Sequence, residues 1–257
     1  MKRTLIKPLH QFILLGVFTM GFLACAPKQA YVVTSTNSNQ NISEEFGAVD
    51  ADVLKIIDPY KSKLDAQMDE KIGEFTSTMD KVKPTSALTN FMADAMLDPA
   101  RKMYPSLGID AAMMNYGGVR LNSVPKGVVT VRMMYELMPF DNTLVIMTLD
   151  SIKMMRLLDR IADSKGWPIS KGIYFEIVDG RAVNATINGE AIKSKNSWVI
   201  ALPNYVAEGG DNCDFLVDAP QEQTAVFIRD LLIDYVRDNK IINPALDKRI
   251  IVADEDK

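Results

Sequence analysis

The sequence has 257 residues, of which 47% are hydrophobic and 24% are charged, and its formal net charge is −4. This composition is typical of a soluble globular protein with a sizeable core, and not of a disordered or fibrous chain. An acidic chain without a basic run argues against nucleic-acid binding. The single histidine, His10, lies in the N-terminal leader, which excludes Ser-His-Asp catalysis and metal sites built on imidazole.

The first 24 residues are predicted to be a signal peptide that is removed. Basic residues precede an apolar run at residues 12–24, which is too short for a membrane span of roughly 20 residues. The run ends at Ala24-Cys25, and a small residue before a cysteine at this place is typical of a bacterial lipobox. We expect lipidation of Cys25 and an exported protein anchored to a bacterial membrane, on its periplasmic or cell-surface side. An ordinary secretory leader is the alternative.

Residues 25–48 are predicted to form a flexible tether after the lipidated cysteine. They include the polar run at residues 34–41, which cannot bury enough apolar surface to become ordered. Residues 49–257 show no break in composition and are predicted to form one domain. Cys213 is the only other cysteine, so no disulfide within the chain is expected, and a buried thiol is the favoured interpretation.

Alternating helical and extended patterns predict a mixed α/β domain. Helices are expected at residues 50–71, 86–103, 151–164 and 221–239, where apolar residues recur three and four apart. Strands are expected at residues 72–78, 109–114, 143–149, 173–178, 182–187, 198–202 and 249–252, and residues 128–138 start extended and become helical. Ser86 is a plausible N-cap, and Pro59 should kink the first helix or shift its start.

The first loop with chemistry suited to a ligand follows the strand at residues 109–114. It contains Asn115, Gly117, Gly118 and Arg120. Adjacent glycines let a ligand approach the backbone, the asparagine amide can donate and accept, and arginine presents a planar fork to carboxylate or phosphate oxygens. By itself the motif is better explained as a tight turn with a solvated arginine.

Two further loops carry aromatic residues. Pro139 ends a helix and places Phe140 in a loop with Asn142. Taken alone, this aromatic is favoured as a core anchor over a stacking surface. Tyr205 precedes the run Gly209-Gly210-Asp211, which is either a turn or a second half of a binding site. Each loop is a weak signal alone.

Together and in this order, the three loops resemble the C-terminal domain of bacterial and animal 5′-nucleotidases. That family carries an Asn-Gly-Gly-Gly-Ile-Arg turn, a Pro-Phe-Gly-Asn-Thr-like loop and an aromatic-x-Ala-x-Gly-Gly-Asp-Gly-Phe segment. Residues 90–96 also resemble its Asn-Leu-x-Ala-Asp-Ala helix. The similarity covers residues 50–253 and implies a mixed α/β fold with sheets between outer helices.

The resemblance implies a binding site for a nucleotide or nucleoside. It places the base between Phe140 and Tyr205, sugar hydroxyls at Asp211, and the sugar and phosphate side at Asn115 and Arg120. The full set of expected substrate-binding residues is Asn115, Gly117, Gly118, Arg120, Phe140, Asn142, Tyr205, Gly209, Gly210 and Asp211.

Three positions depart from the family pattern. Tyr116 replaces a glycine, so its backbone must suit a residue with a Cβ atom. Residues 81–85 read Lys-Val-Lys-Pro-Thr where the family usually has arginine, and this departure bears on one expected phosphate contact. Asn212-Cys213 replaces Gly-Phe after the aspartate.

The family's catalytic metallophosphoesterase domain has no counterpart that fits between Cys25 and residue 50. We therefore expect no catalytic residue, metal or cofactor in this chain, and divalent metals in a partner chain. The leading hypothesis is the substrate-binding half of a phosphoesterase whose metallophosphoesterase is encoded separately. The alternatives are a nucleoside- or nucleotide-binding lipoprotein without hydrolysis, and a domain whose pocket has drifted.

Overall fold

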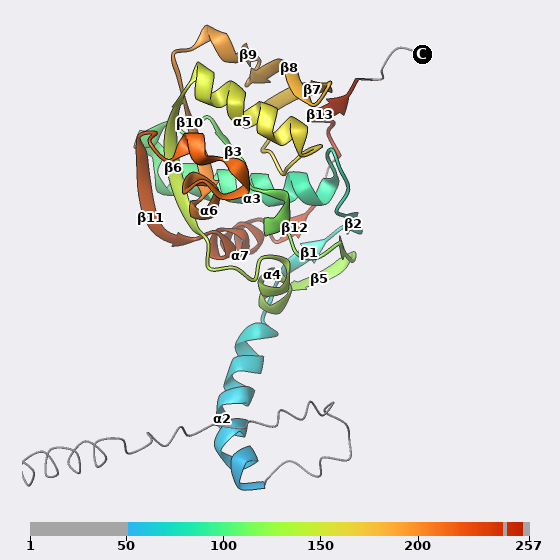
Figure 1. Ribbon diagram of the computed structural model, residues 1–257. Helices are drawn as coiled ribbons and strands as arrows, with labels where there is room; N and C mark the ends of the chain where they lie inside the picture. Colours follow the sequence, from blue (N-terminus) through green and yellow to red (C-terminus); the bar gives the residue numbers. More distant parts are fainter. Residues whose placement is uncertain (1–50, 244–245, 254–257) are drawn as a thin grey trace, which may run out of the picture. The chain divides into compact units, whose positions relative to one another are not determined.

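The central sheet joins strands that are far apart in the sequence (Figure 1). The computed structural model describes residues 51–243 and 246–253. Strands β6 (Thr143–Asp150) and β10 (Ser197–Pro203) pair antiparallel in the middle of the sheet. Strand β11 (Gln221–Phe227) pairs antiparallel with β6, and β3 (Ala111–Ala112) pairs parallel with β10. The loops that follow β3, precede β6 and follow β10 are the three loops singled out by sequence.

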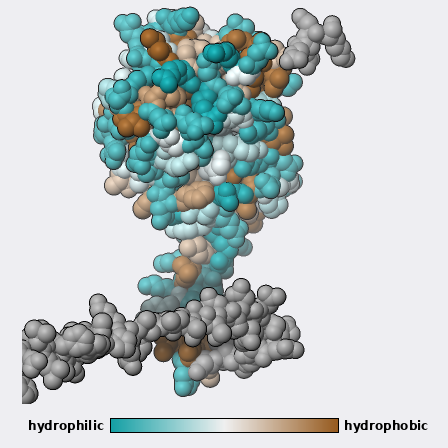
Figure 2. All heavy atoms as spheres, in the orientation of Figure 1, coloured by the Kyte–Doolittle hydropathy of each residue, from teal (hydrophilic) through white to brown (hydrophobic). Residues whose placement is uncertain are grey.

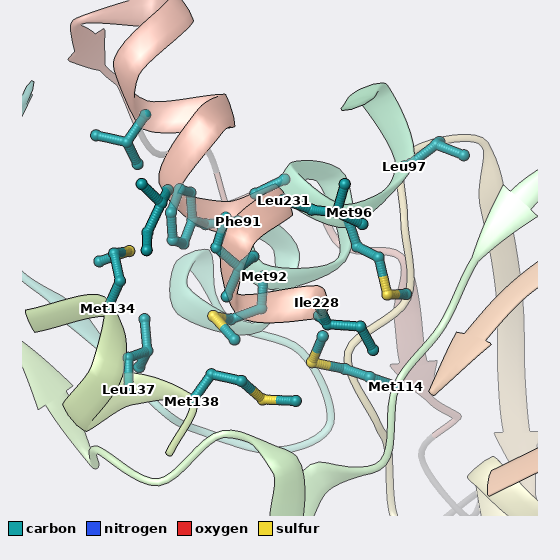
Figure 3. Close-up of a cluster of buried hydrophobic side chains, with 14 of the residues drawn as sticks. Phe91, Met92, Met96, Leu97, Met114, Met134, Leu137, Met138, Ile228 and Leu231 are labelled. Atoms are coloured by element: carbon teal, nitrogen blue, oxygen red, sulfur yellow. The ribbon is translucent and has the colours of Figure 1, made fainter. Parts of the chain in front are cut away.

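One face of this sheet is covered by helices α3 (Ala87–Met103), α4 (Val131–Leu137) and α7 (Ile228–Asn239). Side chains alternate along a strand, so Leu144 and Ile146 of β6 point into this cluster. Figure 3 shows the methionine-rich packing of the three helices in it. A sheet buried on both faces reads as a continuous apolar run, which explains the sequence of β6.

The other face packs against α5 (Ser151–Asp163) and a second sheet. Val145 and Met147 of β6 point to this side. The second sheet has the strand order β13-β7-β8-β9. Its strands are β7 (Ile173–Val178), β8 (Arg181–Ile187), β9 (Glu190–Ala191) and β13 (Ile250–Val252).

Short elements complete the described residues. Strand β1 (Lys71–Phe75) lies between β12 (Ile241–Ile242) and β5 (Gly127–Thr130), and β2 (Met79–Asp80) pairs with β4 (Ser123–Val124). Helix α2 (Ala51–Met68) precedes β1, and α6 (Asn204–Ala207) follows β10. Single 3-10 turns lie at Pro105–Leu107, Tyr116–Gly118, Ile192–Ser194, Gly210–Asn212 and Asp214–Leu216.

The mixed α/β class is confirmed, and most predicted elements are present. Ser86 caps α3 as predicted: its hydroxyl accepts from the Thr89 N–H, and the Thr89 hydroxyl accepts from the Ser86 N–H. Helix α2 begins at Ala51, so Pro59 does not shift its start and lies inside the helix. Residues 128–138 change from strand β5 to helix α4 as expected.

The prediction of one helix over residues 221–239 is wrong for its first third, which forms β11. Thr224 and Val226 are β-branched, and residues along β11 alternate between exposed and half-exposed as in a strand at a sheet edge. The Thr224 hydroxyl also donates to the Leu144 carbonyl (2.8 Å). The helical spacing of apolar residues starts only at Ile228.

The Asn90–Met96 motif has a structural role in this fold. Asp94 forms a two-point ion pair with the buried guanidinium of Arg249, and Asn90 donates to the Asp247 carboxylate (2.6 Å). The motif therefore holds the segment that leads into β13.

The predicted signal peptide, Cys25 and tether lie outside the described residues. Of the helices that are described, none combines the length and the apolar character needed to cross a membrane. The face drawn in Figure 2 is mostly hydrophilic, with hydrophobic residues scattered over it. Cys213 is buried with a free thiol, as predicted.

Candidate functional site: a pocket between three loops

The three loops singled out by sequence meet around one pocket. Its volume is about 350 Å³, within the range of small-molecule sites. The lining residues are Asn115, Gly117, Gly118, Phe140, Asn142, Tyr205 and Asp211. All seven belong to the predicted binding set, so residues nearly 100 positions apart in the chain share one cavity.

Asn115 contributes a buried and unpartnered acceptor to the pocket wall. The residue is only 7% exposed, and among the described residues its Oδ1 has no hydrogen-bond partner. A Cβ atom at Gly118 would lie 3.1 Å from this oxygen, so the glycine is what keeps the space beside it free. A buried acceptor without a partner costs free energy, and a ligand N–H or O–H would remove that cost.

Tyr116 adopts a backbone conformation that suits a residue with a Cβ atom, because its φ is not positive. The ammonium groups of Lys81 and Lys83 lie 4.0 and 4.5 Å from its ring centroid. Lys81 also donates to the Val119 carbonyl (2.6 Å). Burial, and then repulsion by Arg120 and Lys83, lowers the pKa of Lys81. Lys81 and Lys83 thus make this edge of the turn cationic.

The Phe140 loop is held from behind by Arg229 of α7. The buried Arg229 guanidinium donates to the carbonyls of Met138 and Phe140 (both 3.3 Å) and to the Asp141 carboxylate (2.9 Å). It also stacks on the Tyr135 ring, 4.0 Å from the centroid. The backbone on both sides of Pro139 is fixed, while the Phe140 ring stays 40% exposed at the pocket. Phe140 is therefore not a core anchor.

The Tyr205 loop is tied to the start of β6. Asn204 Oδ1 accepts from the Thr143 N–H (3.1 Å), so the loops that carry the two aromatic rings share a hydrogen bond. Tyr205 is 43% exposed. A Cβ atom at Gly210 would lie 2.4 Å from the Tyr205 carbonyl oxygen, so only glycine allows this close approach.

Asp211 sits in a left-handed conformation (φ 53°), followed by Asn212 (φ 62°). Asparagine and aspartate tolerate this region better than most residues with a Cβ atom, which explains how Asn212 replaces the family's glycine. The Asp211 carbonyl accepts from Arg160 Nε (2.6 Å), and the Tyr205 hydroxyl donates to Asp211 Oδ1 (3.4 Å). The carboxylate is thereby fixed at the pocket beside the Tyr205 ring.

Three of the predicted binding residues do not line the pocket. Arg120 is exposed at its edge, with its guanidinium carbon 5.6 Å from the Phe140 ring centroid. Gly209 (φ 98°) and Gly210 shape the loop behind Tyr205 and Asp211. Among the described residues, no carboxylate forms an ion pair with Arg120, so its charge is available to a ligand.

The sequence analysis missed the residues that support the loops from behind, namely Arg229, Arg160 and Asn204. A weak signal existed for Arg229, since it is a charged residue next to the buried positions Ile228 and Leu231. Arg160 and Asn204 gave no signal, because their partners are 51 and 61 residues away.

The divalent metals that the resemblance implies do not fit the residues present here. Within residues 51–243 and 246–253, no group of three or more His, Cys, Asp or Glu side chains is placed to hold a metal ion. The pocket can stack a flat ring, accept from a ligand's hydroxyl or amine groups and place a cation near an anion.

Comparison with known proteins identifies the family of the chain. The family described as "5′-nucleotidase, C-terminal domain" matches residues 66–218. The chain belongs to this family. The resemblance inferred from the three loops is thus confirmed.

Similar proteins are much longer than this chain. Protein UshA of Yersinia enterocolitica is 29% identical over 190 residues, which cover 70% of this chain and 33% of that protein. The 5′-nucleotidase of Vibrio vulnificus is 24% identical over 205 residues, covering 76% and 35%. The chain therefore spans about a third of the length of these relatives.

The fold has solved counterparts. The 5′-nucleotidase precursor from Thermus thermophilus superposes with a TM-score of 0.68 at 24% identity, covering 79% of this chain and 43% of that one. A putative 5′-nucleotidase from Staphylococcus aureus gives a TM-score of 0.63 at 22% identity, covering 82% and 45%.

Proposed function

We propose that this chain is the nucleotide-binding half of a 5′-nucleotidase-type phosphoesterase, and that a separate metallophosphoesterase chain supplies catalysis. The observation that carries the proposal is the pocket itself. Two exposed aromatic rings, a carboxylate and a buried unpartnered amide oxygen converge on a cavity of about 350 Å³.

Each group suits one part of a nucleotide. Phe140 and Tyr205 can stack on a base, which contributes about 1–3 kcal/mol per ring and tolerates many bases. Asp211 can accept from sugar hydroxyls, and Asn115 Oδ1 needs a donor. Arg120 lies at the pocket edge with its charge free for a phosphate.

The need for a partner follows from what the pocket lacks. Phosphate-ester hydrolysis by this class of site relies on metal ions, and the described residues offer no group to hold them. The partner would bring its metals to the phosphate that projects from the pocket. The second candidate, a binding lipoprotein without hydrolysis, is favoured by the same lack of metal ligands.

The experiment is calorimetric titration of the mature chain with AMP and adenosine. Two stacking rings, offset by the ordering cost of association, predict an affinity no tighter than roughly micromolar. Phe140→Ala or Tyr205→Ala should each weaken binding by about tenfold or more. Ile152→Ala, which removes an exposed apolar side chain of α5 outside the pocket lining, is the control and should leave AMP affinity unchanged. A folded wild type that binds neither ligand, alone or with its partner, would disprove the proposal.

Phosphate release separates the two candidates. The mature chain alone should not hydrolyse AMP with or without divalent metal. Adding an exported metallophosphoesterase from the same genome should produce hydrolysis that the Phe140→Ala variant reduces. If no such enzyme gains activity or affinity for AMP from this chain, the binding lipoprotein is the better description.

The proposed place of action is a bacterial membrane surface, through a lipid at Cys25. Cys25→Ser should abolish labelling by radioactive palmitate and release the protein as a soluble exported form. A variant that stays bound to the membrane would refute the anchor.

A further inference from the structure

Helix α2 carries an apolar face that nothing in the described structure covers. Ile56, Ile57, Tyr60 and Leu64 recur at helical spacing, and Ile56 and Tyr60 are 68% and 76% exposed. None of the 18 residues of α2 is buried. Hydrophobic residues are visible along this helix in Figure 2. Helices gain most of their stability by packing such a face. We therefore expect another surface to cover the apolar face of α2.

The position of α2 connects this face to the pocket. Met68, at the end of α2, packs against the first hydrophobic cluster. Arg132 of α4 donates to the carboxylates of Asp65 and Asp69 (both 2.9 Å), which fixes the C-terminal turn of α2 against α4. Helix α4 is seven residues long, about 10 Å, and it leads directly into the Phe140 loop. The C-terminal turn of α2 and the Phe140 loop therefore lie at the two ends of α4.

The charges on α2 do not suit a membrane surface. The helix carries three lysines and three aspartates. Helices that lie on anionic membranes are rich in Lys and Arg on their polar face.

A second copy of this chain is also a poor fit. An α2–α2 pair would use a handful of side chains from each copy, far fewer than the roughly 20–30 residues per side of a standard stable interface. A larger partner that touches α2 and the adjacent domain can supply that area.

The family match indicates which partner this is. It begins at residue 66, so α2 lies almost wholly on the N-terminal side of a unit described as a C-terminal domain. The matched stretch makes up about a third of relatives such as Protein UshA, and a C-terminal domain is by definition preceded in the chain by the rest of its protein.

We propose that the apolar face of α2, formed by Ile56, Ile57, Tyr60 and Leu64, is the docking surface for the metallophosphoesterase chain. This inference rests on the proposed function, since it names where that chain binds. Docking there holds the catalytic chain beside the loop that carries Phe140.

The test compares two double variants in the Cys25→Ser form of the full chain. Ile56→Glu/Tyr60→Glu places two charges on the apolar face. Ser62→Glu/Ala66→Glu places the same two charges, at the same spacing, on the opposite face of α2. The probe is an exported metallophosphoesterase from the same genome that lacks this domain, and its affinity is measured by calorimetry. AMP affinity of each variant alone is measured in parallel.

We expect Ile56→Glu/Tyr60→Glu to weaken the complex by about tenfold or more, and the control pair to stay within about twofold of the wild type. Both should bind AMP as the wild type does, because neither touches the pocket. Equal complex formation by both variants would overturn the docking surface. Failure of the wild type to bind any such enzyme would also overturn it, while retained AMP binding would leave the nucleotide-binding part of the proposed function standing.

Two other results would assign α2 to a different occupant and so contradict the proposal. The first is a wild-type dimer, seen by light scattering, that Ile56→Glu/Tyr60→Glu converts to a monomer. The second is binding of the wild type to vesicles of anionic phospholipid that the same variant loses.

Discussion

Arg229 shows how a single buried residue can control the pocket without facing it. One guanidinium fixes two carbonyls of the Phe140 loop and stacks on Tyr135. Lysine carries the same charge as a point on a flexible stem and cannot reproduce this planar arrangement.

We predict that Arg229→Lys lowers the free energy of unfolding by about 1–3 kcal/mol, because buried carbonyls lose their donors. It should also weaken AMP binding several-fold, because the Phe140 ring loses its fixed position. Arg237→Lys is the control on the same helix, where an exposed ion pair with Glu70 is lost, and it should change stability by no more than about 0.5 kcal/mol. Urea unfolding and calorimetry measure the two effects. Unchanged AMP affinity would show that the loop does not depend on Arg229.

Substitutions at Arg120 and Asp211 should weaken the binding of different ligands. Arg120→Ala should weaken AMP more than adenosine, because the arginine can pair only with the phosphate or the sugar edge. Asp211→Asn should weaken adenosine more than adenine, because it replaces a carboxylate acceptor for the sugar hydroxyls. Titrating the three ligands into both variants tests this, and a uniform loss for all three would refute the assigned roles.

The residues that line the pocket could be predicted from the sequence, whereas the residues that hold its loops in place could not. Asn115, Phe140, Tyr205 and Asp211 sit in short loops with unusual residue combinations, so local sequence carries their signal. Arg160 and Arg229 act through carbonyls that are remote in the chain. Only the fold brings them to their loops.

Among the elements, α3 is a helix whose first residue is determined by the local sequence. Ser86 and Thr89 exchange hydrogen bonds at its first turn. Ser86→Ala should lower the free energy of unfolding by about 1 kcal/mol and leave AMP affinity unchanged, since α3 contributes nothing to the pocket lining. Ser62→Ala, on the exposed α2, should have almost no effect in the same urea experiment. A loss no larger than that of the control would mean that the cap does not stabilise α3.

Strand β11 shows the opposite case. None of its residues is buried, and β11 is an edge strand held by pairing with β6 rather than by packing in a core. The helical spacing of buried residues belongs to the following α7, which starts at Ile228. Edge strands of this kind are the elements that a sequence pattern identifies least well, because tertiary pairing decides between helix and strand.

At the scale of the whole molecule, Cys213 gives the stability a defined pH dependence. Burial raises the pKa of its thiol from 9.0 to about 11. The unfolded chain therefore loses this proton at lower pH than the folded chain. The thiol's contribution is fully present below pH 9 and is lost between about pH 9 and 11.

We predict that the free energy of unfolding falls across that interval, with up to about 3 kcal/mol of the fall due to the thiol. Cys213→Ala should be less stable at neutral pH but should show a shallower fall. The difference between the two urea-unfolding curves isolates this group from the tyrosines and lysines that titrate in the same range. Parallel curves for both proteins would contradict the assignment.

Oxidation of the buried methionines in the two hydrophobic clusters can report which part of the fold opens. Met114 and Met138 lie on one side of the central sheet, and Met113 and Met147 on the other, all fully buried. Peroxide reaches a thioether only when its surroundings open, and the sulfoxide then stays as a mark on that residue. Mass spectrometry after mild oxidation would therefore tell which side of the sheet loosens first, and whether AMP slows the side that carries the Phe140 loop.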